Sequence, residues 1–149
     1  MGYEIKLIAG EIGATKTFIE IASVDLSKIG NGPLSKLIAY SKGKETPDFS
    51  DWKFLKDVKG SHLDVDTSAS EIFDIGMNYN NVEIWEGDGK ISEDLYGDPL
   101  PAIPVKQVLA ALHEELKYER YRRFELAKEL LEELSTSKWD NIFIVPYGH

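Results

Sequence analysis

The hydrophobic pattern of the chain changes its period at three closely spaced prolines, Pro99, Pro101 and Pro104. Before them, in residues 3–25, apolar side chains alternate as in β-strands; after them, in residues 104–135, they recur every three or four residues, as in α-helices. Proline fixes φ and has no N–H to donate, so we expect an irregular bridge between the two parts. The pattern predicts an α+β fold, in which sheet and helices come from different parts of the chain.

Residues 3–25 predict a β-hairpin at the centre of the sheet. Apolar residues occur on both faces of its two strands, which is typical of strands that are covered on both sides, and the turn is expected at 10–16. The other predicted elements are strands at 34–41, 70–75, 81–86 and 141–145, the last closed by Pro146, and a short helix at 46–58 that begins after Thr46. The sheet is expected to be antiparallel or mixed, with five or six strands.

The C-terminal third predicts a long, bent helical region on one face of the sheet. One straight helix over 104–135 would be about 48 Å long at ~1.5 Å per residue. A compact domain of this size has a radius of gyration of roughly 15 Å and is roughly 38–40 Å across. We therefore expect a bend, or a junction of two helices, within 117–123. The side chains predicted to be buried are Ile5, Leu7, Ile19, Ile21, Leu109, Leu112, Leu116, Phe124, Ala127, Leu130, Leu134, Ile142 and Ile144.

The length and composition predict one domain, residues 1–149, in a reducing compartment. A chain of 149 residues can bury enough apolar surface to be stable without disulfides, and it contains no Cys. The N-terminal residues have no basic region followed by an apolar run, and no apolar stretch approaches the length of a membrane span. We expect a cytoplasmic protein of a host cell or a virus-infected cell, without a membrane partner.

The negative charge of the chain is concentrated between residues 61 and 103. This acidic segment has one Lys and ten Asp or Glu, and it accounts for the whole net charge of −9. A strongly acidic protein is poorly suited to direct nucleic-acid binding, because phosphate contacts require clustered cations. Clustered carboxylates instead favour a basic protein partner.

Aromatic residues are interleaved with these acids, which a purely solvated loop would not require. We predict a partner-binding face in which Trp85 or Tyr96 is the anchor and the carboxylates steer the partner. Its residues are Glu83, Trp85, Glu86, Asp88, Asp94 and Tyr96. The alternative is that Trp85 belongs to the core and that the acids neutralise arginines of the same molecule.

All arginines of the chain lie within residues 117–123. Guanidinium groups recognise carboxylates and phosphates, and neighbouring Tyr rings can stack on them or on a ligand. An anion-binding patch would use Tyr118, Arg120, Tyr121, Arg122 and Arg123. Alternatively, these arginines pair with the acidic segment or with acids on their own helix. The sequence leaves both alternatives open.

No catalytic, metal or cofactor site is predicted from the sequence. The acidic turns at 64–68 and 86–89 do not keep the spacing of an EF-hand loop. The three histidines, at positions 62, 113 and 149, lack the spacing of zinc ligands. The Gly-x-Ser-x-Gly turn that exposes a hydrolase nucleophile is also absent.

One segment resembles a known family. Leu7 to Thr17, with the sequence LIAGEIGATKT, resembles the first phosphate-binding hairpin of sugar kinases of the glucokinase type, which is usually written Asp-x-Gly-Gly-Thr-Lys. The resemblance implies a turn that meets nucleotide phosphates and an acid that serves the metal. Glu11 stands where that family has Asp, and Ala14 replaces its second Gly. We interpret the segment as a hairpin turn of similar sequence, since Gly-x-Ala-Thr suits a turn for local reasons.

Three classes of function therefore remain. The first is a non-enzymatic acidic protein-binding module that occludes a basic partner surface, such as a toxin-immunity protein or a phage-encoded anti-defence inhibitor. The second is an enzyme or ligand-binding protein that grips an anionic small molecule through the cluster at 120–123. The third is a structural or assembly subunit, a homo-oligomer in which the acidic face meets the Arg cluster of a neighbouring copy. We favour the first class.

Overall fold

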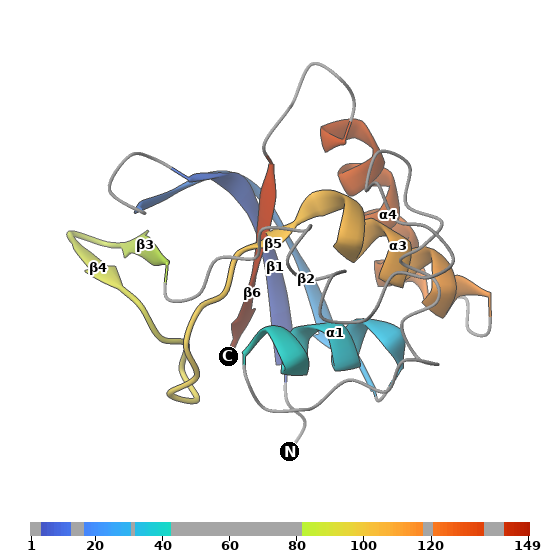
Figure 1. Ribbon diagram of the computed structural model, residues 1–149, viewed down its shortest axis with the longest axis horizontal. Helices are drawn as coiled ribbons and strands as arrows, with labels where there is room; N and C mark the ends of the chain where they lie inside the picture. Colours follow the sequence, from blue (N-terminus) through green and yellow to red (C-terminus); the bar gives the residue numbers. More distant parts are fainter. Residues whose placement is uncertain (1–3, 13–16, 31, 43–81, 118–120, 136–141) are drawn as a thin grey trace, which may run out of the picture.

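The computed structural model describes residues 4–12, 17–30, 32–42, 82–117, 121–135 and 142–149. Within these residues, six strands form one mixed sheet in the order β4-β3-β2-β1-β6-β5, accompanied by three helices (Figure 1). The elements are β1 (Glu4–Ile12), β2 (Thr17–Lys28), α1 (Pro33–Ser41), β3 (Glu83–Glu86), β4 (Gly89–Ile91), β5 (Ile103–Pro104), α3 (Val105–Leu116), α4 (Arg122–Leu134) and β6 (Phe143–Gly148). The predicted α+β class and the mixed sheet are confirmed.

The hairpin of β1 and β2 lies in the middle of the sheet, as predicted. β1 pairs antiparallel with β2 on one side and with β6 on the other. The strands run further toward the turn than expected, because Gly10 belongs to β1 and pairs with Glu20. A Cβ at Gly10 would collide with the backbone carbonyl of Ile19, so only glycine allows the two strands to approach here.

Two residues of β2 that were predicted to be buried are exposed. Ile19 has 55% of its surface accessible and Ile21 has 38%. On the same strand, Val24 and Leu26 pack into the core beneath the helices. Ile19 instead pairs with the exposed Glu11 near the turn of the hairpin, beyond the part of β2 that the helices cover. Ile21 lies at a register shift: Ala9 pairs with Ala22 and Gly10 with Glu20, so Ile21 has no partner on β1. Phe18 and Val24, which simple alternation would place on one face, therefore lie in the clusters on opposite faces of the sheet.

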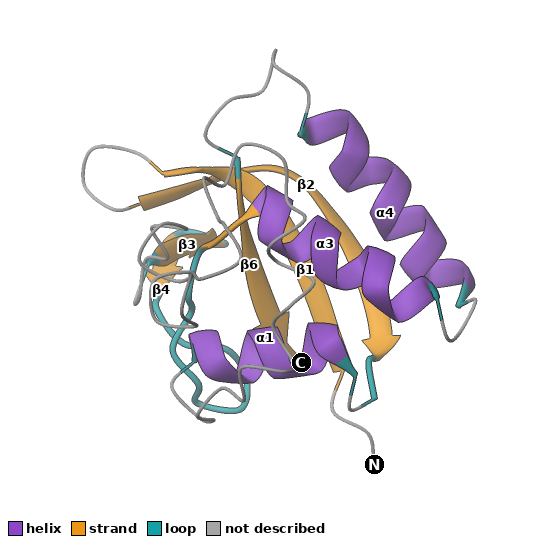
Figure 2. Cartoon of the chain, turned by 45° about the vertical axis from the view of Figure 1, so that its right-hand side comes forward, coloured by secondary structure: helices purple, strands orange, loops and turns teal. Residues whose placement is uncertain are grey.

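The C-terminal third forms two separate helices instead of one long bent helix. α3 ends at Leu116 and α4 begins at Arg122, so the predicted junction within 117–123 is confirmed. The buried residues recur at helical spacing: Val105, Val108, Ala111 and Leu112 in α3, and Phe124, Ala127, Leu131 and Leu134 in α4. Leu109, Leu116 and Leu130 are partly buried against the same core. Figure 2 shows α1 and α3 crossing the same side of the sheet.

Residues 33–41 form helix α1, so the strand predicted at 34–41 is wrong. Leu34, Leu37 and Ile38 are buried at helical spacing. The Glu115 carboxylate of α3 accepts a hydrogen bond from Leu34 N (3.1 Å) and so caps the first turn of α1. This cap comes from a residue 81 positions away, which no local pattern reveals. Gly32 leaves room for this contact, because a Cβ there would displace the Glu115 carboxylate from the cap.

Two prolines lie inside strands, where the sequence predicted none. Pro104 belongs to the two-residue strand β5, and Pro146 continues β6 instead of ending it. Gly148 N–H points away from β1, toward Asp94. Backbone N–H groups two residues apart on a strand point to the same side, so the nitrogen of Pro146 also faces away from β1. β5 does not extend to this position, because it pairs only with Phe143 and Ile144. The missing N–H of Pro146 therefore costs no pair with β1.

The described residues form two hydrophobic clusters, one on each face of the sheet. The larger cluster joins the helices to β1, β2 and β6; the smaller one lies on the other face and contains Ile8, Phe18, Val82, Ile84, Leu100, Ala102, Phe143, Val145 and Tyr147. Among the described helices, none is long and apolar enough to cross a membrane. The predicted helix at 46–58 and the predicted strand at 70–75 lie outside the described residues.

Candidate functional site

Trp85 lies on a short strand that only partly joins the sheet. β3 pairs in parallel with β2 at two positions, Thr17 with Glu83 and Phe18 with Ile84. Beyond them β3 turns at Gly87, which has a positive φ, and pairs with β4. Figure 1 shows this β3–β4 hairpin at the opposite end of the molecule from α3 and α4. The hairpin therefore presents its own surface, away from the helices.

In β3, Ile84 is the one buried side chain. Ile84 is buried in the smaller cluster, while Glu83 and Glu86 are exposed. Trp85 has 59% of its surface accessible, so the alternative that it belongs to the core is wrong. Lys90 of β4 holds its Nζ 4.9 Å from the centroid of the Trp85 ring and donates a hydrogen bond to Thr17 Oγ1 (3.1 Å). The exposed indole thus makes a cation–π contact with its neighbour on β4.

A surface pocket of about 240 Å³ opens beside Trp85. Its floor is apolar, because Ile8, Phe18 and Ile84 are all buried. Its rim consists of charged and aromatic side chains from four strands: Lys6 of β1, Glu20 of β2, Trp85 and Glu86 of β3, and Tyr147 of β6. We call it the Trp85 pocket. The pocket combines an apolar floor with charged and aromatic side chains that can bind a charged ligand.

Glu86 connects β3 to β6 across this pocket. Burial raises the pKa of the Tyr147 hydroxyl, and the charges of Glu86 and Asp94 and a hydrogen bond with Glu86 raise it further. The hydroxyl therefore remains protonated at neutral pH and can donate to the Glu86 carboxylate. The Lys6 ammonium lies 5.5 Å from the centroid of the Tyr147 ring. These contacts link Glu86 of β3 and Lys6 of β1 to Tyr147 of β6.

Asp94 was predicted to steer a partner, but it is buried in the protein. Its Oδ2 lies 2.7 Å from Lys42 Nζ, and both side chains are inaccessible to solvent. Its Oδ1 accepts hydrogen bonds from the N–H groups of Tyr96 (2.9 Å) and Asp98 (3.1 Å). Burial alone would raise the pKa of Asp94, but the bonds to Lys42, Asp98 and Tyr96 outweigh it, so the pKa lies below 3.8. Asp94 fixes the loop after β4 instead of facing a partner.

The structure brings together four of the six residues predicted for the partner face. Glu83, Trp85, Glu86 and Asp88 lie on the β3–β4 hairpin or its turn and are exposed. Tyr96 is half exposed in the following loop, and its hydroxyl donates to the carbonyl of His149 (2.8 Å). Sequence reasoning missed the pocket residues of β1, β2 and β6. Strand alternation could have placed several of them on one face, but the order of the strands, which brings β1, β2, β3 and β6 to one pocket, has no signal in the sequence.

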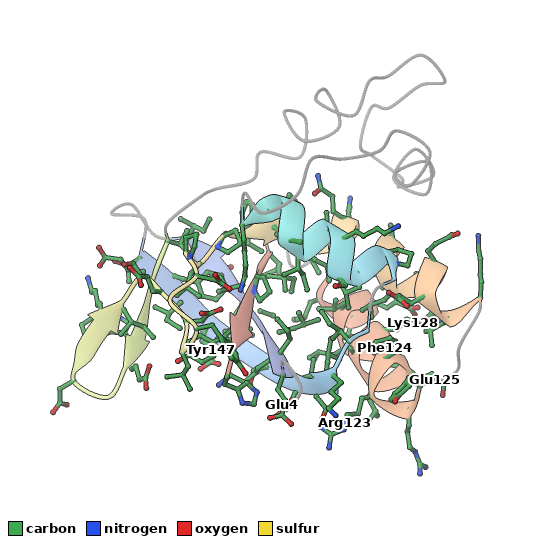
Figure 3. All side chains as sticks on the ribbon, turned by 90° about the horizontal axis from the view of Figure 1, so that it is seen from below. Glu4, Arg123, Phe124, Glu125, Lys128 and Tyr147 are labelled. Carbon is green, nitrogen blue, oxygen red and sulfur yellow. The ribbon has the colours of Figure 1, made fainter. Side chains whose placement is uncertain are left out.

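The arginine cluster forms a second, separate pocket of about 480 Å³. It is lined by Ser27, Lys28, Tyr121, Arg122 and Arg123. The predicted residues Tyr118 and Arg120 lie outside the described residues. Figure 3 shows Tyr147, on the rim of the Trp85 pocket, and Arg123 at different positions along the molecule, with Glu4 between them. Three cationic side chains therefore gather away from the acidic hairpin.

Arg123 is paired, but not with the acidic segment. Its Nη1 donates to the backbone carbonyl of Asp25 (3.1 Å) and lies 3.8 Å from Asp25 Oδ1. Asp25 belongs to β2, outside residues 61–103. In the part of the chain that the structure describes, no ion pair joins the acidic segment to Arg122 or Arg123. The expected neutralisation of the acids by these arginines is not found there.

Comparisons with known proteins give no further identification. No family model, curated protein sequence or solved structure matches the chain. The segment from Leu7 to Thr17 that resembles a kinase phosphate-binding hairpin lies on β1 and at the start of β2, with residues 13–16 outside the described residues.

Proposed function

We propose that the chain is a non-enzymatic protein-binding module that uses the β3–β4 hairpin to occlude a basic surface of a partner. The observation that carries this proposal is the exposure of Trp85 beside a pocket with a buried apolar floor. Glu83, Glu86 and Asp88 are exposed on the same hairpin. Trp residues are enriched among the side chains that contribute most to binding at protein interfaces, so a large exposed indole is a natural anchor.

The surrounding charge determines the kind of partner. Carboxylates around an aromatic anchor attract a cationic surface and speed its association, and they disfavour acidic competitors. A basic toxin or defence enzyme has this character, so toxin-immunity protein or anti-defence inhibitor is the specific form of the proposal. The absence of Cys suits the cytoplasm of a host or virus-infected cell.

The proposal is tested by reversing the charge of the hairpin. The partner is first captured from a lysate of the source organism at low salt. We expect Glu83→Lys with Asp88→Lys to slow association with that partner by about tenfold or more at low ionic strength. The difference should shrink near 1 M salt, where the screening length is only ~3 Å. Stopped-flow or biosensor association rates measure this effect.

A matched control is available on α4. Glu129→Lys with Glu133→Lys changes the net charge by the same amount at exposed positions of a different element. We expect this control to change the association rate much less than the hairpin reversal. Equal slowing by both pairs would mean that only the net charge of the protein matters, and it would contradict the proposed face.

The second pocket supports a second candidate function, the binding of an anionic small molecule. Lys28, Arg122 and Arg123 place three cations around one opening, and Tyr121 adds a ring for stacking. If a polyphosphate binds there, ATP without metal should raise the unfolding temperature in a concentration-dependent way. Arg122→Gln should remove most of this increase. An unchanged unfolding temperature, or the same increase in the variant, would exclude this candidate.

A further inference from the structure

We propose that the Trp85 pocket receives one arginine side chain of the partner. This inference rests on the proposed function and adds the chemical identity of the group that is recognised. An arginine side chain has an apolar stem and a flat cationic end. The pocket offers a matching surface to each part: a buried apolar floor and a rim with an indole and two carboxylates.

The floor suits the stem of the side chain. Ile8, Phe18 and Ile84 expose at most 8% of their surfaces, so the bottom of the pocket offers no polar group of theirs to be desolvated. A methylene chain laid against it loses contact with water without loss of hydrogen bonds. An acidic or short polar side chain would gain nothing from this floor.

The rim suits a guanidinium group. Glu20 of β2 and Glu86 of β3 both line the pocket, so two strands each bring a carboxylate side chain to it. A guanidinium has five donors in one plane and can bond carboxylates while it stacks on an aromatic ring. Glu86 also accepts a hydrogen bond from Tyr147, which ties its carboxylate to β6.

The cations already present do not fill this role. Lys6 lies on the rim, but its ammonium is directed over the ring of Tyr147. Lys90 occupies a position over the indole of Trp85. The second contact shows that this indole accepts a cation. Glu20 and Glu86 have no cationic partner among the described ion pairs. An incoming guanidinium would supply the missing positive charge.

The test uses a small probe, so that it does not depend on a known partner. N-acetyl-arginine methylamide is titrated into the intact protein, and the amide and Trp85 indole N–H signals are followed by NMR. N-acetyl-citrulline methylamide has nearly the same shape without the charge. We expect saturable shifts of Trp85, Phe18 and Ile84 with the arginine probe, and at least tenfold weaker binding of the citrulline probe.

Variants separate the pocket from general attraction of cations. Glu20→Gln is exposed, which favours retention of the fold, and it should weaken binding of the arginine probe about fivefold or more. Glu129→Gln removes a carboxylate from α4 and should leave it unchanged. Equal binding of both probes, shifts at α4 instead of the pocket, or no shifts at all would overturn the inference. Because no partner is present, this result is independent of whether the hairpin binds a protein.

Discussion

We expect Lys42→Met to lower the free energy of unfolding by about 3–5 kcal/mol, the usual cost of removing one member of a buried ion pair. Lys42 Nζ and Asp94 Oδ2 are 2.7 Å apart and both side chains are inaccessible to solvent. Without the ammonium, Asp94 keeps its bonds to backbone N–H groups but loses its counter-charge. Urea unfolding followed by circular dichroism measures the difference.

The acid dependence gives a second readout of the same pair. The folded-state pKa of Asp94 lies below 3.8, so the carboxylate contributes stability that is complete above this value and is lost as the pH falls through the folded-state pKa. The difference between wild type and Lys42→Met should therefore be largest near neutral pH and narrow in acid. A difference that grows as the pH falls would contradict the assigned pairing.

Lys128→Met is the control for this prediction. Lys128 also pairs with a carboxylate, at 3.3 Å from Glu132, but both side chains are substantially exposed. An exposed pair of this kind contributes about 0.2–1 kcal/mol. Similar losses in Lys42→Met and Lys128→Met would mean that the Lys42 pair is not buried in solution.

The second large effect concerns the helix-side core. We expect Leu112→Ala to lower the free energy of unfolding by about 2–5 kcal/mol, because the side chain is completely buried in α3 and its removal leaves a cavity. Leu130→Ala, at a partly buried position of α4, should cost less. Thermal or urea unfolding of both variants measures which of them loses more stability.

Leu126→Ala on α4 is the matched control, since its side chain is 54% exposed. We expect a change within about 0.5 kcal/mol, which is usual for surface positions. If Leu112→Ala cost less than about 1 kcal/mol, the face that α3 turns to the sheet would be wrongly assigned.

The parts of the fold that were predicted correctly are those with a strong local period. The hairpin at 3–25 and the two helical stripes follow from alternation and from three-to-four spacing. Helix α1 was missed although Leu34, Leu37 and Ile38 have helical spacing, because the segment is short and its cap, Glu115, is distant in sequence. Local patterns cannot reveal a cap supplied by another helix.

In the candidate site, too, local sequence patterns predicted some features and missed others. The exposed aromatic and acidic residues of 83–88 could be predicted, because strand alternation and clustered charge are sequence properties. The burial of Asp94 could not, since it depends on Lys42, which is 52 positions away. The pocket itself depends on the side chains of Glu86 of β3 and Tyr147 of β6 meeting, although β2 and β1 lie between these strands in the sheet. That arrangement is a property of the assembled sheet.

The central claim, that Trp85 anchors the partner, is tested most directly by the dissociation rate of the captured complex. Trp85→Ala should raise the dissociation constant about 30-fold or more, mainly through faster dissociation, because truncating an interface anchor costs about 2 kcal/mol or more. Tyr121→Ala is the matched control, since Tyr121 is 48% exposed beside the other pocket. It should leave the rate unchanged. Faster dissociation in Tyr121→Ala, with wild-type dissociation in a correctly folded Trp85→Ala, would contradict the claim.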